Sequence, residues 1–202
     1  MTYLISTLIF AVVGTAQLNI FEIEGIFSNA HINALEGHIE EYEYTDDDLL
    51  ILQYSSQEGS AESIAELNSL LSGYDFPIGV WFGPYKISID FEQLNNFDYI
   101  GFSPGLEINN VSFDESVEKK YCTINICNFE ERKIIVSTNE GIYDNYLIVG
   151  TLGSFIENID FVISDQSIEF FKPSLFERFY IAISNPIFTY CLLYTSPSPR
   201  DP

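Results

Sequence analysis

The chain has 202 residues, of which 47% are hydrophobic and 19% charged, a balance that is typical of one folded domain and not of a disordered segment. Its formal net charge is −22, and no Lys or Arg precedes Lys86. Such a chain has little with which to neutralise phosphates, so the charge excludes nucleic acid as a partner and suits the outer side of a membrane.

The N-terminal segment is apolar from Tyr3 to Val13 and then continues with the small residues GTA before Gln17. This pattern is typical of a secretory signal peptide and its cleavage site. Because a positively charged start is missing, a buried first strand is the alternative. We predict a signal peptide at 1–16 and a folded domain at 17–172.

Strands and helices alternate through the first half of that domain. Trp81 falls on an apolar run, which predicts a place in the core. Two successive strand–helix–strand units imply a parallel sheet covered on both faces. The periodicities predict, in order, a strand at 18–24 ended by Gly25, a helix capped by Ser28 or Asn29, a buried strand at 49–54, a polar turn at 55–60, a second helix, and buried strands at 77–82 and 98–102.

The second half is less regular. The patterns predict strands at 133–137 and 146–149, a helix at 152–159, and paired strands near 161–163 and 167–171. No segment carries a P-loop, a dinucleotide-binding GxGxxG, an HExxH or a CxxC pattern, so no cofactor is predicted.

Cysteines and histidines give no strong signal of a site. Cys122 and Cys127 can form a bridge only if a tight turn brings their backbones within about 7 Å, and we expect free thiols. His31 and His38 share a helix face, but no carboxylate or cysteine is placed to complete a metal site beside them. We therefore expect solvent-facing histidines and no metal.

The C-terminal end departs from ordinary domain sequence. The run from Phe179 to Leu193 is apolar but shorter than the roughly 20 residues of a spanning helix. The letters CLLYTSPSPRD that follow Tyr190 resemble the translation of a sequencing adapter. Residues 191–202 are therefore set apart as a non-native tail.

A family resemblance rests on three blocks in order: LLILQYSSQEGSAESIAELNSLL, FPIGVWFGP and FDYIGFSPGLEI. The stretches at 137–160 and 171–190 add to it. Together these blocks resemble the NfeD family of membrane-bound, ClpP-class serine proteases. In that family a strand enters an Asp-Thr-Pro-Gly-Gly turn, a second strand ends in Pro before a Ser-Ala-Gly with the nucleophile, and a third ends in Ala-Pro-Gly.

The resemblance implies an α/β fold, a ClpP/crotonase-like spiral of βαβ units with a mostly parallel sheet, followed by the start of a transmembrane helix at 173–190. It implies a membrane-anchored protein whose domain lies on the extracytoplasmic side. The implied partners are stomatin-like membrane proteins with apolar C-terminal segments, and a homo-oligomer is possible.

The family's chemistry needs a serine, a neutral lysine and backbone N–H groups that hold an oxyanion. Here the turn reads SSQEG, so Glu58 and Gly59 become the oxyanion-hole candidates, and only Ser88 stands near the nucleophile position. The alternative for Ser88 is an ordinary helix or loop serine. For the lysine the candidates are Lys133 and the pair Lys119 and Lys120, which a charged run places on a solvated surface.

Three functions follow from these observations. The first is a protease-like domain that is catalytically impaired and acts by binding a membrane-protein partner. The second is an active Ser–Lys endopeptidase that uses Ser88. The third is a crotonase-like acyl-CoA enzyme, which the predicted export disfavours because CoA chemistry is intracellular.

Overall fold

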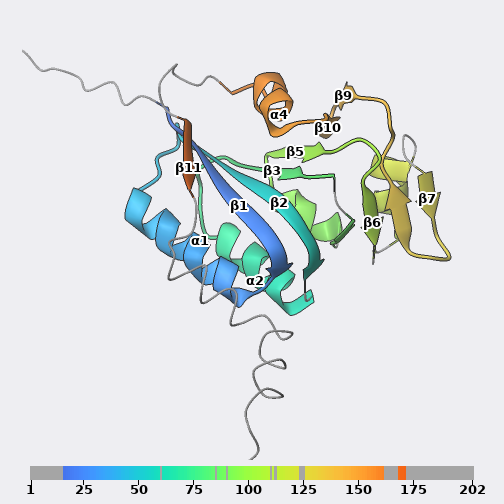
Figure 1. Ribbon diagram of the computed structural model, residues 1–202, viewed down its shortest axis with the longest axis horizontal. Helices are drawn as coiled ribbons and strands as arrows, with labels where there is room; N and C mark the ends of the chain where they lie inside the picture. The colour runs from blue at the N-terminus through green and yellow to red at the C-terminus, as the bar shows by residue number, and fades with distance from the viewer. Residues whose placement is uncertain are drawn as a thin grey trace, which may run out of the picture.

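The computed structural model describes residues 16–59, 61–84, 86–89, 91–109, 111, 113–122, 126–161 and 168–171. These residues form a seven-stranded sheet in the order β11-β1-β2-β3-β5-β10-β9 and a four-stranded sheet in the order β4-β6-β8-β7 (Figure 1). In chain order the elements are β1 (Leu18–Phe27), α1 (Asn29–Tyr42), β2 (Leu49–Gly59), α2 (Ala61–Leu71), β3 (Ile78–Phe82), β4 (Ile87–Ser88), the 3₁₀ helix η1 (Phe91–Asn96), β5 (Tyr99–Phe102), β6 (Glu107–Asn109), α3 (Glu115–Val117), the π-helical turn η2 (Glu118–Cys122), β7 (Ile126–Asn128), β8 (Lys133–Ile135), β9 (Gly141–Tyr143), β10 (Tyr146–Ile148), α4 (Leu152–Asn158) and β11 (Ile168–Phe171).

The seven-stranded sheet is largely parallel, as predicted. β11, β1, β2, β3, β5 and β10 pair in parallel, and β9 joins β10 in an antiparallel hairpin. The two predicted strand–helix–strand units are β1–α1–β2 and β2–α2–β3. The mixed α/β class and the parallel sheet are therefore confirmed.

Helices cover both faces of this sheet. α1 and α2 lie against one face and α4 lies against the other (Figure 1). Each face has its own apolar cluster, one that includes Phe21 and Leu35 and another that includes Trp81 and Phe155. Trp81 is 5% exposed, so its predicted place in the core is confirmed.

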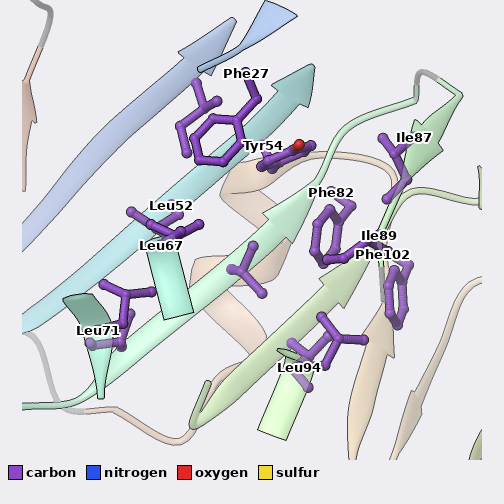
Figure 2. Close-up of a cluster of buried hydrophobic side chains, with 14 of the residues drawn as sticks. Phe27, Leu52, Tyr54, Leu67, Leu71, Phe82, Ile87, Ile89, Leu94 and Phe102 are labelled. Atoms are coloured by element: carbon purple, nitrogen blue, oxygen red, sulfur yellow. The ribbon is translucent and has the colours of Figure 1, made fainter. Parts of the chain in front are cut away.

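A row of aromatic rings crosses the carboxyl ends of four parallel strands. Phe27 on β1, Tyr54 on β2, Phe82 on β3 and Phe102 on β5 have neighbouring ring centroids 5.7, 5.5 and 5.4 Å apart. Figure 2 shows these rings together, with the side chains of β4 and its flank close to Phe82. The buried side chains of β4 and its flank, Ile87 and Ile89, belong to the same apolar cluster as these rings.

The four-stranded sheet is small and is buried on one face. Ile87, Ile108 and Ile134 occupy one row across β4, β6 and β8, and each is fully buried. The neighbouring residues on each strand point to the other face, because side chains alternate along a strand. That outer face carries the candidate residues Ser88 and Lys133.

Two sequence predictions about strands are wrong. The strand predicted to end at Gly25 continues to Phe27, with a register shift between Gly25 and Ile26, and Gly25 has a φ of +78°. The turn predicted at 55–60 is, up to Gly59, a continuation of β2 that pairs with β1. A buried hydroxyl makes this possible, because Ser56 Oγ donates to the Gly25 carbonyl at 2.6 Å and accepts from the Phe27 N–H at 3.0 Å.

The C-terminal strand predicted at 167–171 is present as β11. It pairs in parallel with β1, from Leu18↔Ile168 to Phe21↔Phe171. Residues 162–163 lie outside the described residues, as do 1–15 of the predicted signal peptide and the segments 173–190 and 191–202. No helix in the described part of the chain is long and apolar enough to cross a membrane.

Candidate active site

The candidate site lies where the parallel strands end. β2, β3 and β5 run side by side, so their carboxyl ends meet at one edge of the large sheet, which is the usual position of a site in such folds. The backbone there is engaged in pairing. The Gly83 N–H donates to the Tyr54 carbonyl at 3.0 Å, and the Ser103 N–H donates to the Phe82 carbonyl at 2.9 Å. These two N–H groups are therefore committed to the fold and do not stand ready for an oxyanion.

The oxyanion-hole candidates Glu58 and Gly59 lie in the ladder between β1 and β2. Glu58 pairs with Ile26 and Gly59 pairs with Phe27. The resemblance placed both in a turn, and their place on a strand overturns that local prediction. Their role in holding an oxyanion stays a prediction.

Ser88 lies on β4, and neither in a helix nor in a loop. The flanking side chains of Ile87 and Ile89 are buried against the aromatic row, as Figure 2 shows. Ser88 is half-buried and points to the opposite face because side chains alternate along a strand. Its two neighbours therefore fix the direction of the hydroxyl.

Ser88 and Lys133 share one row of the four-stranded sheet. Ser88 is opposite Asn109 on β6, and Asn109 is opposite Lys133 on β8. Residues directly opposite each other project from the same face, so all three side chains share the outer face. Two strand spacings place the backbones of Ser88 and Lys133 about 10 Å apart. The structure thus brings the two candidates to one surface, with Asn109 between them.

The ammonium of Lys133 is held by a carboxylate. Lys133 Nζ lies 2.9 Å from Glu107 Oε2, and Lys86 Nζ lies 2.7 Å from Glu107 Oε1. Hydrogen bonds from Lys133 and then from Lys86 lower the pKa of Glu107, so this carboxyl is ionised near neutral pH. In this pair the Lys133 ammonium donates to Glu107, whereas a general base must accept a proton. The geometry therefore disfavours Lys133 as a base in this arrangement.

The other two lysines lie elsewhere. Lys119 is exposed on η2, as predicted for a solvated surface. Lys120 is half-buried, with its Nζ 5.4 Å from the centre of the Tyr121 ring, and it lines a cavity of about 330 Å³ together with Asp98 and Asp144. That cavity lies at the amino end of β5, which is the edge opposite the candidate site.

The histidines are buried, so the prediction that they face solvent is wrong. His31 is 3% exposed, and its Nε2 lies 3.1 Å from the Glu24 carbonyl while the Ser28 N–H donates to its Nδ1 at 3.4 Å. Burial lowers the pKa of His31, against a smaller opposing effect of the hydrogen bond to Glu24. His38 is 8% exposed, and its Nε2 is 3.0 Å from the Tyr44 hydroxyl. Both rings therefore serve the packing of α1.

The cysteines are bridged, contrary to the expectation of free thiols. Cys122 and Cys127 form a disulfide with a Cα–Cα distance of 5.5 Å. The bridge links η2 to β7, the edge strand of the four-stranded sheet. It thus fastens the sheet that carries Ser88 and Lys133.

Two polar residues of this face were not identified as candidate site residues from the sequence. Glu107 and Asn109 flank the buried Ile108 on a strand of three residues, and the letters EIN are too short a run to reveal a period. The alternation of polar, apolar and polar residues is the signal that could have found them.

Comparisons with known proteins give a likeness of structure. No family model matches the chain, and no curated protein matches it. Among solved structures, 1510-N, a membrane protease specific for a stomatin homologue from Pyrococcus horikoshii, has 11% sequence identity and a TM-score of 0.57, over 85% of this chain and 100% of that one. The chain shares the fold of this protease.

Two mutants of the same 1510-N protease agree. A lysine-to-alanine mutant in complex with a substrate peptide has 10% identity and a TM-score of 0.54, over 84% of this chain and 99% of that one. A serine-to-alanine mutant has 9% identity and a TM-score of 0.50, over 80% and 100%. The predicted resemblance to the NfeD type of membrane-bound protease is thus confirmed at the level of the fold.

Proposed function

We propose that this chain is a protease-like domain of the NfeD type that is impaired in peptide hydrolysis and acts by binding an apolar segment of a stomatin-like membrane protein. The support for the fold is the likeness to a stomatin-specific protease along the whole of that chain. The support for impairment is the outer face of the four-stranded sheet, where Lys133 is paired with Glu107 instead of facing Ser88. The spiral arrangement of ClpP-like proteins and the predicted homo-oligomer belong to this proposal.

Binding a peptide requires fewer features of this face than hydrolysing it does. β4 is an edge strand of its sheet, and an extended segment of a partner can add to such an edge through backbone hydrogen bonds. The half-buried Ile135 on β8 and the exposed Ile126 on β7 lie on the same outer face towards the other edge of the sheet, and they offer apolar contacts to a partner that extends across this face. A partner strand held there needs neither a neutral lysine nor a formed oxyanion hole.

The domain is proposed to lie on the extracytoplasmic side, anchored through residues 173–190 after removal of a signal peptide at 1–16. The disulfide between Cys122 and Cys127 supports this location, because such bonds persist in oxidising compartments. The net charge of −22 fits it as well. The same disulfide weighs against the acyl-CoA enzyme, whose chemistry is intracellular.

An active Ser–Lys peptidase is the second candidate. The observation that favours it is the shared row of Ser88, Asn109 and Lys133. In that case Lys133 would leave Glu107 when a substrate binds and give up a proton to solvent. It would then accept the proton of Ser88 as the serine oxygen attacks the peptide carbonyl, and pass that proton to the amine that leaves when the peptide bond breaks; water would hydrolyse the resulting acyl-enzyme.

One experiment separates these two candidates. The chain, its Ser88→Ala variant and the control Ser69→Ala, which changes an exposed serine on α2, are each mixed with a synthetic peptide carrying the apolar C-terminal segment of a stomatin-type protein. We expect binding without cleavage by all three. Cleavage that Ser88→Ala abolishes and Ser69→Ala retains would establish the active peptidase, and a peptide that none of the three binds would refute the proposed function.

A further inference from the structure

A second concave site lies at the amino edge of the seven-stranded sheet, away from Ser88. It is a cavity of about 400 Å³ formed by the loops that lead from α1 into β2 and from α2 into β3. Because both loops precede their strands, the cavity lies at the edge of the sheet opposite the candidate active site. A volume of this size holds a long side chain or a small ligand.

Aromatic rings form one wall of the cavity. The Tyr44 and Phe76 rings are stacked with centroids 4.4 Å apart and planes 17° apart, and the Tyr74 ring lies 5.4 Å from Phe76. All three residues line the cavity. The face of an aromatic ring is negative and attracts a cation placed within about 6 Å of its centre.

Carboxylates form the rim. Glu43, Asp46 and Asp75 line the cavity, and all three are exposed. Asp48 belongs to the same acidic run, but it is 7% exposed and accepts from the Gln17 and Thr45 N–H groups at 2.9 Å, so it serves the fold. The rim carboxylates remain available to a ligand.

Backbone dipoles and more distant charges add to the negative electrostatic potential at the cavity. α1 ends at Tyr42 beside the cavity, and the end of α2 at Leu71 precedes its second loop, so two helix C-termini with their partial negative charge lie close by. Burial, and next the charges of Glu36 and Glu40, raise the pKa of Tyr74. No Lys or Arg precedes Lys86, whose ammonium is engaged by Glu107 on the other sheet. The first half of the domain thus supplies no cation of its own to this rim.

We propose that the cavity binds the side chain of a lysine or arginine presented by a basic segment of a partner protein. An aliphatic stem with a charged head fits a pocket that has aromatic walls and an anionic rim. A metal ion fits less well, since no group of three or more His, Cys, Asp or Glu residues in the described ranges is arranged to hold one. This site is independent of the peptide-binding face proposed above.

The test uses the 202-residue chain and two acetylated pentapeptide amides that carry either lysine or norleucine between glycines. Binding is followed by the backbone amide shifts in two-dimensional NMR. We expect the lysine peptide to move the signals of Tyr44, Tyr74 and Phe76, and to bind more weakly as the salt concentration rises. The norleucine peptide, which has the same stem without the charge, should leave these signals in place.

Matched variants locate the effect. The triple variant Glu43→Gln, Asp46→Asn, Asp75→Asn should weaken binding of the lysine peptide at least about tenfold. A control with the same change in net charge, Glu130→Gln, Glu131→Gln, Glu157→Gln, alters three exposed residues elsewhere and should stay within about twofold. Tyr74→Leu removes one ring and should weaken binding about two- to fivefold.

Three results would overturn the proposal: equal weakening by the two triple variants, equal binding of the norleucine peptide, or no shift at the cavity residues with either peptide. The first would indicate attraction to the net charge alone. None of the three bears on the apolar peptide at the four-stranded sheet, so failure here and failure of the proposed function are distinguishable.

Discussion

The two sheets hold their residues by different means. In the seven-stranded sheet, β1 and β2 pair over ten consecutive positions, and helices cover both faces. The strands of the four-stranded sheet have two or three residues each, and one face is open. Burial of apolar side chains stabilises the first sheet. In the second, a disulfide and the ion pairs of Glu107 supplement a single buried row.

The contacts that position the candidate site are therefore easier to break than those that hold the fold. Ser88 and Lys133 belong to the small sheet, so their relative position depends on links that acid or a reductant can break. The fold depends on the large sheet, which a reductant does not affect directly and which acid reaches through the buried His31. Substitutions in the large sheet should therefore lower the stability of the whole domain, and changes in the small sheet should have smaller, local effects.

The largest effect is expected in the core of the seven-stranded sheet. Phe155 on α4 is fully buried against β3 and β5, and Phe155→Ala should lower the free energy of unfolding by about 3–5 kcal/mol, measured by denaturation in guanidinium chloride. Ile126→Ala on the small sheet is the control, since Ile126 is 68% exposed and its loss should cost less than about 0.5 kcal/mol. Similar losses of unfolding free energy from both variants would contradict the difference between the two sheets.

A substitution at Gly101 tests the same packing in a second way. A Cβ at Gly101 would lie 2.5 Å from Phe155 Cδ2 and 2.9 Å from Trp81 Cδ1. Gly101→Ala alone should therefore destabilise the fold by about 1–3 kcal/mol through overpacking. The same change should cost less when Phe155 is already alanine, because the two residues compete for one space. Additive losses of unfolding free energy in the double variant would contradict the close contact between Gly101 and Phe155.

The next effect is expected at the disulfide. Replacing Cys122 and Cys127 together by serine should destabilise the four-stranded sheet by roughly 2 kcal/mol, the value for closing a short loop. Hydrogen exchange should then accelerate at the amides of β7 and β8 and stay unchanged in β1 and β2. Faster exchange throughout both sheets would show that the bridge stabilises the whole domain and not one part of it.

Regular elements could be predicted from sequence, and the short ones could not. α1 and α2 follow from a period of 3.6 that extends over the whole helix, and β3 follows from a continuous apolar run. The extension of β2 was missed because SSQEG has the composition of a turn, while Ser56 Oγ satisfies the backbone of β1 across its bulge. Such a bond joins residues about thirty positions apart and leaves no local pattern.

The same limit applies to the candidate site. Ser88 and Lys133 could be singled out by resemblance, but their common row depends on the register of three short strands. The burial of His31 depends on a neutral ring that bonds the backbone on both sides, and spacing alone does not reveal this.

Acid should act on the two regions in different pH ranges. The pKa of His31 is lowered by burial, so its contribution to stability is complete above its ordinary value of 6.5 and is lost as pH falls from there towards the lower value in the folded state. The pKa of Glu107 is lowered by its lysines, so its contribution is complete above 4.5 and is lost only below that pH.

Thermal unfolding of the wild type, His31→Gln and Glu107→Gln between pH 7 and pH 3 checks this order. We expect His31→Gln to remove the decline that begins near pH 6.5, and Glu107→Gln to remove only the decline below pH 4.5. A wild-type profile that stays flat down to pH 4.5 would show that the pKa of His31 is not lowered in the folded state.

The smallest effect compares two residues with left-handed backbone conformations. Glu43 ends α1 with a φ of 52°, and Arg132 precedes β8 with a φ of 51°. Glycine adopts this conformation without strain, so Glu43→Gly should stabilise the fold by about 0.5–1 kcal/mol. Arg132 Nε donates to the Val111 carbonyl at 3.2 Å, and Arg132→Gly loses this bond, worth about 1 kcal/mol. Its net effect should therefore be close to zero by calorimetry. Equal stabilisation by both changes would mean that this bond contributes nothing, and that the small sheet relies less on side-chain links than its geometry indicates.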